Sequence, residues 1–129
     1  MAPHVDYTDV VVNKPEQTCD FLQAQMGFFR YNEQNGDEKP TSSSLLIGNE
    51  FGDKFRLWDA SIRGKSRPQK RQSILIRTND CLRDYYHLGR AGVRFKSKPV
   101  YTAKGLSFSF LDTSGNSFMV LEQRDYLED

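Results

Sequence analysis

Aromatic, cationic and thioether side chains occupy alternate positions in several short segments that the sequence predicts to be strands. Because successive side chains of a strand point to opposite faces, alternate residues share one face of a sheet. Val10 and Val12 suit packing beneath a helix, so Tyr7 and Asp9 should lie on the opposite face. The same alternation assigns eight residues to a ligand cleft: Tyr7, Asp9, Arg56, Trp58, Ser73, Leu75, Arg77 and Met119.

These side chains favour a planar or aromatic organic ligand that carries an anionic group. The ligand ring would stack on Trp58, and Arg56 or Arg77 would donate paired hydrogen bonds to the anion. The structural alternative is that Asp9 only neutralises an arginine and that Trp58 belongs to the core. Acid–base chemistry by Asp9 or Tyr7 has no specific support in the sequence, so no catalytic residue is assigned.

The two cysteines lie at comparable places, each near the start of a predicted helix. A thiolate at a helix N-terminus can act as a nucleophile, but no histidine is spaced to pair with Cys19 or Cys81. The sequence also has no Ser-His-Asp arrangement and no Gly-rich phosphate loop. We therefore expect both cysteines to be structural thiols without a disulfide.

The elements that position these residues form the same series twice. In the first half, strands are expected at 5–12, 28–32, 43–47 and 54–59, with a helix that begins at Pro15 and ends at Gly27. In the second half, strands are expected at 73–78, 93–97, 106–111 and 117–122. Asn79 or Asp80 would cap the second helix. Each half is thus a βαβββ module.

The landmarks of the two halves recur at a nearly constant distance, which indicates a duplication. Asn13 and Asn79 precede the two helices 66 residues apart, Gly27 and Gly92 follow them 65 apart, and Gly52 and Gly115 lie in the hairpin turns 63 apart. We expect a single domain over 1–129, with module one at about 4–60, a basic linker at 61–71 and module two at about 72–124.

Charge and hydropathy exclude several classes of partner. Eighteen basic and seventeen acidic residues give a net charge of +1, which supplies no general field for nucleic acid or an anionic membrane. The basic linker has no aromatic residue and is read as a solvated connection. No segment is apolar enough to span a membrane, and the first residues lack the features of a signal peptide. The expectation is a cytoplasmic protein.

Three segments resemble a known superfamily by their order and spacing. Residues 21–28, Phe-Leu-Gln-Ala-Gln-Met-Gly-Phe, are similar to a helix that ends in Leu-Gly-Phe, and residues 89–95 resemble the corresponding end in a second module. Residues 110–116, Phe-Leu-Asp-Thr-Ser-Gly-Asn, are similar to a Phe-x-Asp-Pro-Asp-Gly-Asn turn. Together they resemble the vicinal oxygen chelate superfamily of glyoxalases, bleomycin-resistance proteins, fosfomycin-resistance enzymes and extradiol dioxygenases, over about 5–122.

The resemblance implies an α+β fold in which two tandem βαβββ modules form open curled sheets around a cleft, the glyoxalase/bleomycin-resistance/dihydroxybiphenyl dioxygenase fold. It also implies a homodimer. In the enzymatic members a divalent metal is bound by His, Glu or Gln, at positions that correspond to Tyr7, Arg56, Ser73 and Met119. Arginine has no lone pair to donate and methionine is a soft, weak ligand, so we expect no metal cofactor.

Other candidate metal ligands fall outside these positions. His4 lies eight residues before Val12, where the family's first ligand lies five before, and Glu122 lies beyond the last ligand position. We interpret them as a terminal histidine and a strand-end carboxylate. His87 should be a surface residue of the second helix.

Three hypotheses follow. The first is a metal-independent small-molecule binding protein of the glyoxalase and bleomycin-resistance type, whose ligand is planar or aromatic and carries an anionic group. The second is a metal-dependent lyase, isomerase or dioxygenase of the same superfamily, with a divalent metal at ligands other than those named. The third is a non-catalytic structural or regulatory partner protein. The sequence leaves open whether the modules pair within one chain or exchange between subunits.

Overall fold

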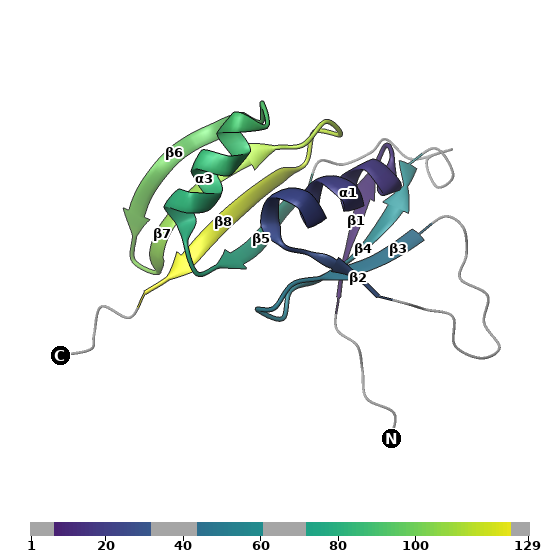
Figure 1. The fold of residues 1–129 in the computed structure, drawn as a ribbon, viewed down its shortest axis with the longest axis horizontal. Coiled ribbons are helices and arrows are strands. Elements are labelled where there is room, and N and C mark those ends of the chain that lie inside the picture. Colours follow the sequence, from purple (N-terminus) through teal and green to yellow (C-terminus); the bar gives the residue numbers. More distant parts are fainter. Residues whose placement is uncertain (1–6, 32–43, 61–71, 125–129) are drawn as a thin grey trace, which may run out of the picture. The chain divides into compact units, whose positions relative to one another are not determined.

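The computed structural model describes residues 7–31, 44–60 and 72–124. The chain divides into two compact units, Met1–Gln69 (unit 1) and Lys70–Asp129 (unit 2). In the described residues each unit is a four-stranded mixed sheet with a helix across one face (Figure 1). The predicted linker at 61–71 lies outside the described residues. No helix in the described part of the chain is long and apolar enough to cross a bilayer.

Unit 1 has strand order β1-β4-β3-β2, in which β1 runs parallel to β4 and the other neighbours are antiparallel. Helix α1 packs on β3 and β4. The bounds of its elements are β1 Thr8–Val12, α1 Pro15–Met26, β2 Phe29–Arg30, β3 Ser44–Gly48 and β4 Lys54–Asp59.

Unit 2 repeats this arrangement with strand order β5-β8-β7-β6, and β5 runs parallel to β8. Helix α3 packs on β6, β7 and β8. The bounds are β5 Ser73–Thr78, α3 Cys81–Arg90, β6 Arg94–Thr102, β7 Gly105–Leu111 and β8 Ser117–Gln123. The predicted α+β architecture of two βαβββ modules is therefore confirmed.

The helix ends follow the sequence signals. Pro15 opens α1, where its missing amide hydrogen costs nothing, and Gly27 ends it with a φ of 71°. Asp80 caps α3 by accepting a hydrogen bond from the Arg83 amide at 3.0 Å. Helix α3 continues through Gly89 to Arg90, and Gly92 follows with a φ of 84°.

The two hairpin turns share one hydrogen-bond pattern, with asparagine and aspartate exchanged. Asn49 Oδ1 accepts from the amides of Phe51 (3.0 Å) and Asp53 (2.9 Å), and its amide nitrogen donates to the Asp53 carboxylate at 3.0 Å. In unit 2, Asp112 Oδ1 accepts from the amides of Ser114 (2.9 Å) and Asn116 (2.7 Å), and the Asn116 side-chain nitrogen donates to Asp112 Oδ2 at 3.1 Å. This shared turn is structural support for the duplication.

The strand β6 is longer than the sequence predicted. We expected it to end at 97, but it reaches Thr102 because pairing with β7 resumes after register shifts between Phe95 and Ser97 and between Ser97 and Val100. Strand β6 forms one edge of its sheet, and Pro99 is tolerated at an edge because no neighbouring strand needs its amide hydrogen. In unit 1, β2 is shorter than expected.

Both units bury alternate strand residues against their helices, as the period of two predicted. In unit 1, Val10, Val12 and Leu57 are fully buried with Leu22 of α1. In unit 2 the core is rich in phenylalanine, and the rings of Phe110 and Phe118 stack with centroids 5.2 Å apart. The faces turned away from the helices therefore carry the candidate ligand-binding residues.

Candidate functional site

The face of the unit 1 sheet opposite α1, here the unit 1 open face, gathers four of the predicted residues. Tyr7 and Asp9 come from the β1 side, and Arg56 and Trp58 come from β4. Because β1 and β4 are neighbours, Asp9 lies beside Arg56 and Val11 lies beside Trp58. The alternation places these side chains on the face away from buried Val10.

Contacts among these four residues fix their orientation. The Trp58 indole donates a hydrogen bond from Nε1 to Asp9 Oδ1 at 2.8 Å. The Arg56 guanidinium carbon lies 4.9 Å from the centroid of the Tyr7 ring, and its Nη1 donates to the Ser44 hydroxyl at 3.1 Å. Trp58 is only partly buried, so it is not a core residue. The result is an indole and a guanidinium held on one open surface.

The sequence interpretation missed further residues on this face. Tyr31 follows β2, and its ring lies against Gly48, where an added Cβ would be 2.9 Å from the ring. The Lys54 ammonium lies 5.3 Å from the Tyr31 centroid, and the Phe29 ring meets Tyr31 edge-on at 5.2 Å. The alternation of β4 already placed Lys54 beside Arg56 on this face, and that signal could have been used.

The corresponding face of unit 2, here the unit 2 open face, gathers the other four predicted residues. Ser73, Leu75 and Arg77 are exposed on β5 and alternate with buried neighbours. Met119 on β8 pairs in register with Leu75, and the two side chains are 40% and 41% exposed. The eight residues that were predicted to line one cleft thus form two groups of four, one on each unit.

Serines that the sequence interpretation left out lie beside this second set. Ser117 pairs with Ser73, and Ser109 pairs with Met119 across the β7–β8 ladder. Ser107 is buried and lies opposite Leu121. The unit 2 open face therefore combines hydroxyl and aliphatic groups with the Arg77 guanidinium, whereas the unit 1 open face is aromatic and cationic.

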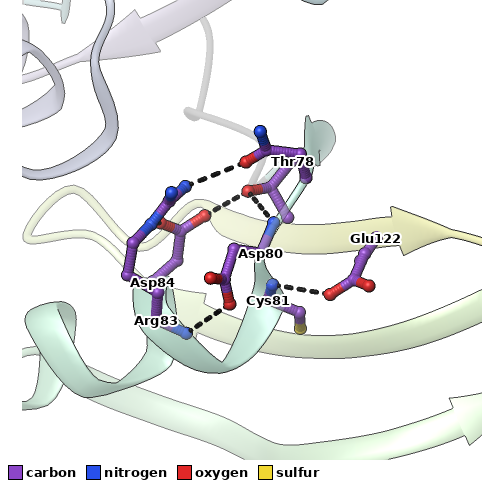
Figure 2. A network of polar contacts seen from close by, with 7 residues as sticks. Thr78, Asp80, Cys81, Arg83, Asp84 and Glu122 are labelled. Carbon is purple, nitrogen blue, oxygen red and sulfur yellow. Dashed lines mark hydrogen bonds and ion pairs between the residues drawn. The ribbon is translucent and has the colours of Figure 1, made fainter.

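A polar network at the start of α3 involves the most buried carboxylate among the described residues (Figure 2). Asp84 is 3% exposed and accepts hydrogen bonds from the Thr78 hydroxyl at 2.5 Å and from Arg83 Nε at 3.2 Å. The Thr78 oxygen in turn accepts from the Asp80 amide at 3.2 Å. These bonds tie the end of β5 to the first turn of α3, which is a structural role.

Glu122 completes the network from β8. Its Oε1 accepts a hydrogen bond from the Cys81 amide at 2.9 Å (Figure 2). Its Oε2 pairs with Arg124 at 2.8 Å. A carboxylate at the first turn of a helix satisfies an amide that has no partner within the helix. Glu122 is thus a strand-end carboxylate, as expected, with a specific partner.

The cysteines have the properties of structural thiols. Cys19 and Cys81 are free and buried. Burial raises the pKa of Cys81 from 9.0 to about 11, with help from the nearby Glu122 and Asp84 carboxylates, and burial also raises the pKa of Cys19. A raised pKa disfavours the thiolate, so neither thiol suits nucleophilic catalysis.

The positions that correspond to the family's metal ligands do not fit a divalent metal. Arg56 lies over the Tyr7 ring on the unit 1 open face, and Ser73 and Met119 lie on the unit 2 open face. A guanidinium cannot coordinate a cation, and a thioether is a poor ligand for a hard one. Residues 7–31, 44–60 and 72–124 contain no group of three His, Cys, Asp or Glu that could hold a metal ion. His4 lies outside the described residues.

Comparison with solved structures supports the fold. The chain is similar to TnmS3, an antibiotic binding protein from Streptomyces sp. CB03234, with 24% identity, a TM-score of 0.72, and coverage of 95% of this chain and 98% of that one. It is also similar to a member of the glyoxalase/bleomycin resistance protein/dioxygenase superfamily from Sphaerobacter thermophilus DSM 20745. The identity is 21%, the TM-score is 0.72, and the match covers 93% of this chain and 97% of that one.

A third similar structure is the fosfomycin resistance protein FosX from Listeria monocytogenes, with 16% identity, a TM-score of 0.64, and coverage of 96% of this chain and 94% of that one. No curated protein matches the sequence. The family model for the Glyoxalase/Bleomycin resistance protein/Dioxygenase superfamily matches residues 4–120. The chain therefore belongs to the Glyoxalase/Bleomycin resistance protein/Dioxygenase superfamily.

Proposed function

We propose that the protein binds a small organic molecule without a metal ion, and that the ligand is planar or aromatic and carries an anionic group. The observation that carries this proposal is that two side-chain contacts on the unit 1 open face orient an indole and a guanidinium. The Trp58 indole is held by Asp9 at 2.8 Å, and the Arg56 guanidinium is held over Tyr7 at 4.9 Å. An oriented indole and guanidinium can bind a ring and its acid group at a low entropic cost.

The chemistry of the ligand positions supports binding without a metal. The residues at the family's metal positions supply a phenol, a guanidinium, a hydroxyl and a thioether, and three of these can instead hydrogen-bond an organic ligand. TnmS3, which has a similar fold, is described as an antibiotic binding protein. That description supports a binding role for this chain.

Isothermal titration calorimetry with 2-naphthoate, a planar aromatic anion, tests the proposal. We expect binding, with 2-naphthalenemethanol, the neutral analogue, binding more weakly. Arg56→Met keeps the aliphatic stem but removes the charge, and it should weaken 2-naphthoate about tenfold. Arg30→Met is the matched control because Arg30 forms an exposed ion pair with Glu16 at 3.1 Å, so its affinity should change by less than about twofold.

Two results would contradict the proposal. Equal affinity for 2-naphthoate and 2-naphthalenemethanol would show that Arg56 does not recognise the anionic group. Elemental analysis of protein purified without a chelator addresses the metal: a stoichiometric amount of zinc, nickel, manganese or iron would overturn metal-independent binding. We expect 2-naphthoate affinity to be unchanged after treatment with EDTA.

A further inference from the structure

Lys54 is a cation on the unit 1 open face that the proposed ligand contacts do not use. Its ammonium lies 5.3 Å from the centroid of the Tyr31 ring. In the described residues no carboxylate forms an ion pair with Lys54, and the Asp53 side chain next to it accepts a hydrogen bond from Asn49 at 3.0 Å. A half-buried lysine backed by an aromatic ring is a ready binding partner for an anion.

The local structure holds this lysine in place. Gly48 pairs with Lys54 across the β3–β4 ladder, and the Tyr31 ring occupies the space above Gly48 that a Cβ would fill. The Tyr31 ring is supported on its edge by Phe29 at 5.2 Å. The absence of a side chain at Gly48 is therefore what lets the ring reach the ammonium of Lys54.

Lys54 and Arg56 are two residues apart on β4, so they share a face and their Cα atoms are roughly 7 Å apart. Each cation lies over its own aromatic ring, Tyr31 for Lys54 and Tyr7 for Arg56. Asp9, which lies beside Arg56 in the β1–β4 register, accepts the Trp58 indole hydrogen bond through Oδ1. The face thus presents two separate cations rather than one.

We propose that Lys54 forms a second anion subsite, so that the preferred ligand is an aromatic dianion with one acid group at Arg56 and the other at Lys54. This inference rests on the proposed function and specifies its ligand class. The second acid group would gain one charge-assisted hydrogen bond at a partly exposed site. Such a contact should strengthen binding about fivefold.

Calorimetric titration with 2,6-naphthalenedicarboxylate and with 2-naphthoate tests the subsite. Wild type should bind the dicarboxylate about fivefold more tightly. Lys54→Met should remove this preference and leave 2-naphthoate affinity unchanged, whereas Lys54→Arg should retain the preference. Lys14→Met is the matched control, because Lys14 is an exposed unit 1 lysine whose side chain makes no capping hydrogen bond, and it should behave as wild type.

The outcomes separate the two proposals. If 2-naphthoate binds but the dicarboxylate is not preferred, or if Lys54→Met keeps the preference, the second subsite is wrong and the proposed function stands. If Lys54→Met loses both ligands while its circular dichroism spectrum is native, Lys54 belongs to the first anion site and the second subsite is again wrong. If neither naphthalene acid binds to wild type, the proposed function fails as well.

Discussion

Replacing Cys81 by alanine should make the protein's stability less sensitive to alkaline pH. Cys81 is fully buried, and burial raises its pKa from 9.0 to about 11. Below pH 9 the thiol is protonated in both the folded and the unfolded chain. As the pH rises from 9 toward 11 only the unfolded chain loses this proton, so ionisation favours unfolding. The contribution of the protonated Cys81 thiol to the unfolding free energy is therefore complete below pH 9 and is lost as the pH rises to about 11.

The size of the effect follows from the shift in pKa. A shift in pKa from 9.0 to about 11 corresponds to at most about 3 kcal/mol of unfolding free energy. Between about pH 8 and about pH 10.5 the wild type should lose about 2 kcal/mol more unfolding free energy than Cys81→Ala. All other side chains are common to both proteins, so their effects cancel in the difference.

Urea denaturation followed by circular dichroism, repeated across this pH range, measures the difference. The substitution also leaves a small cavity, which should lower stability by about 1 kcal/mol at neutral pH, so the comparison uses the slope against pH and not the absolute value. The Cys81 amide still reaches Glu122, since that bond comes from the backbone. Parallel loss of stability in both proteins would refute a raised pKa for Cys81.

Three further predictions concern Cys81, the glycines Gly105 and Gly27, and Asp9. In the native protein at neutral pH, Cys81 should react with a thiol reagent at least about 100-fold more slowly than free cysteine, and urea should remove this protection; rapid labelling of the folded protein would contradict a structural role. Gly105→Ala should lower the unfolding free energy by about 3 kcal/mol or more, because φ is +146° and the new Cβ would clash with the backbone carbonyl oxygen of Glu122. Gly27 has a φ of +71°, but a Cβ added there would meet no other part of the chain within 4 Å, so Gly27→Ala should lower the unfolding free energy by only about 1 kcal/mol. Equal urea midpoints for the two alanine variants would be inconsistent with this reasoning. Asp9→Ala should free the Trp58 indole from its 2.8 Å hydrogen bond, so fluorescence anisotropy should fall and 2-naphthoate should bind more weakly; unchanged anisotropy would show that Asp9 does not orient the ring.

The sequence was sufficient to predict the two modules because local signals coincide with the elements. Proline at the start of α1, glycine after both helices and the alternation in β1, β4 and β5 all have direct structural causes. The full length of β6 could not be predicted, because its pairing resumes after two register shifts and depends on β7 rather than on its own pattern.

The candidate site could be predicted only in part for a similar reason. Alternation tells which side chains share a face, and it correctly separated Arg56 and Trp58 from Leu57. It does not tell which long side chains meet across strands, so the contact of Lys54 with Tyr31 over Gly48 could not be inferred. Contacts of this kind depend on the three-dimensional sheet and not on spacing along one strand.

The β6 edge of the unit 2 sheet has a consequence for how the protein behaves at high concentration. A strand from another molecule that approached β6 would meet the exposed Lys96 and Lys98, a proline ring in place of an amide at Pro99, and a backbone bent by two shifts in pairing. Each of these opposes the regular ladder on which intermolecular sheets grow. The β6 edge thus discourages the backbone hydrogen-bond ladder from continuing into a second molecule, and it opposes fibril growth from that edge.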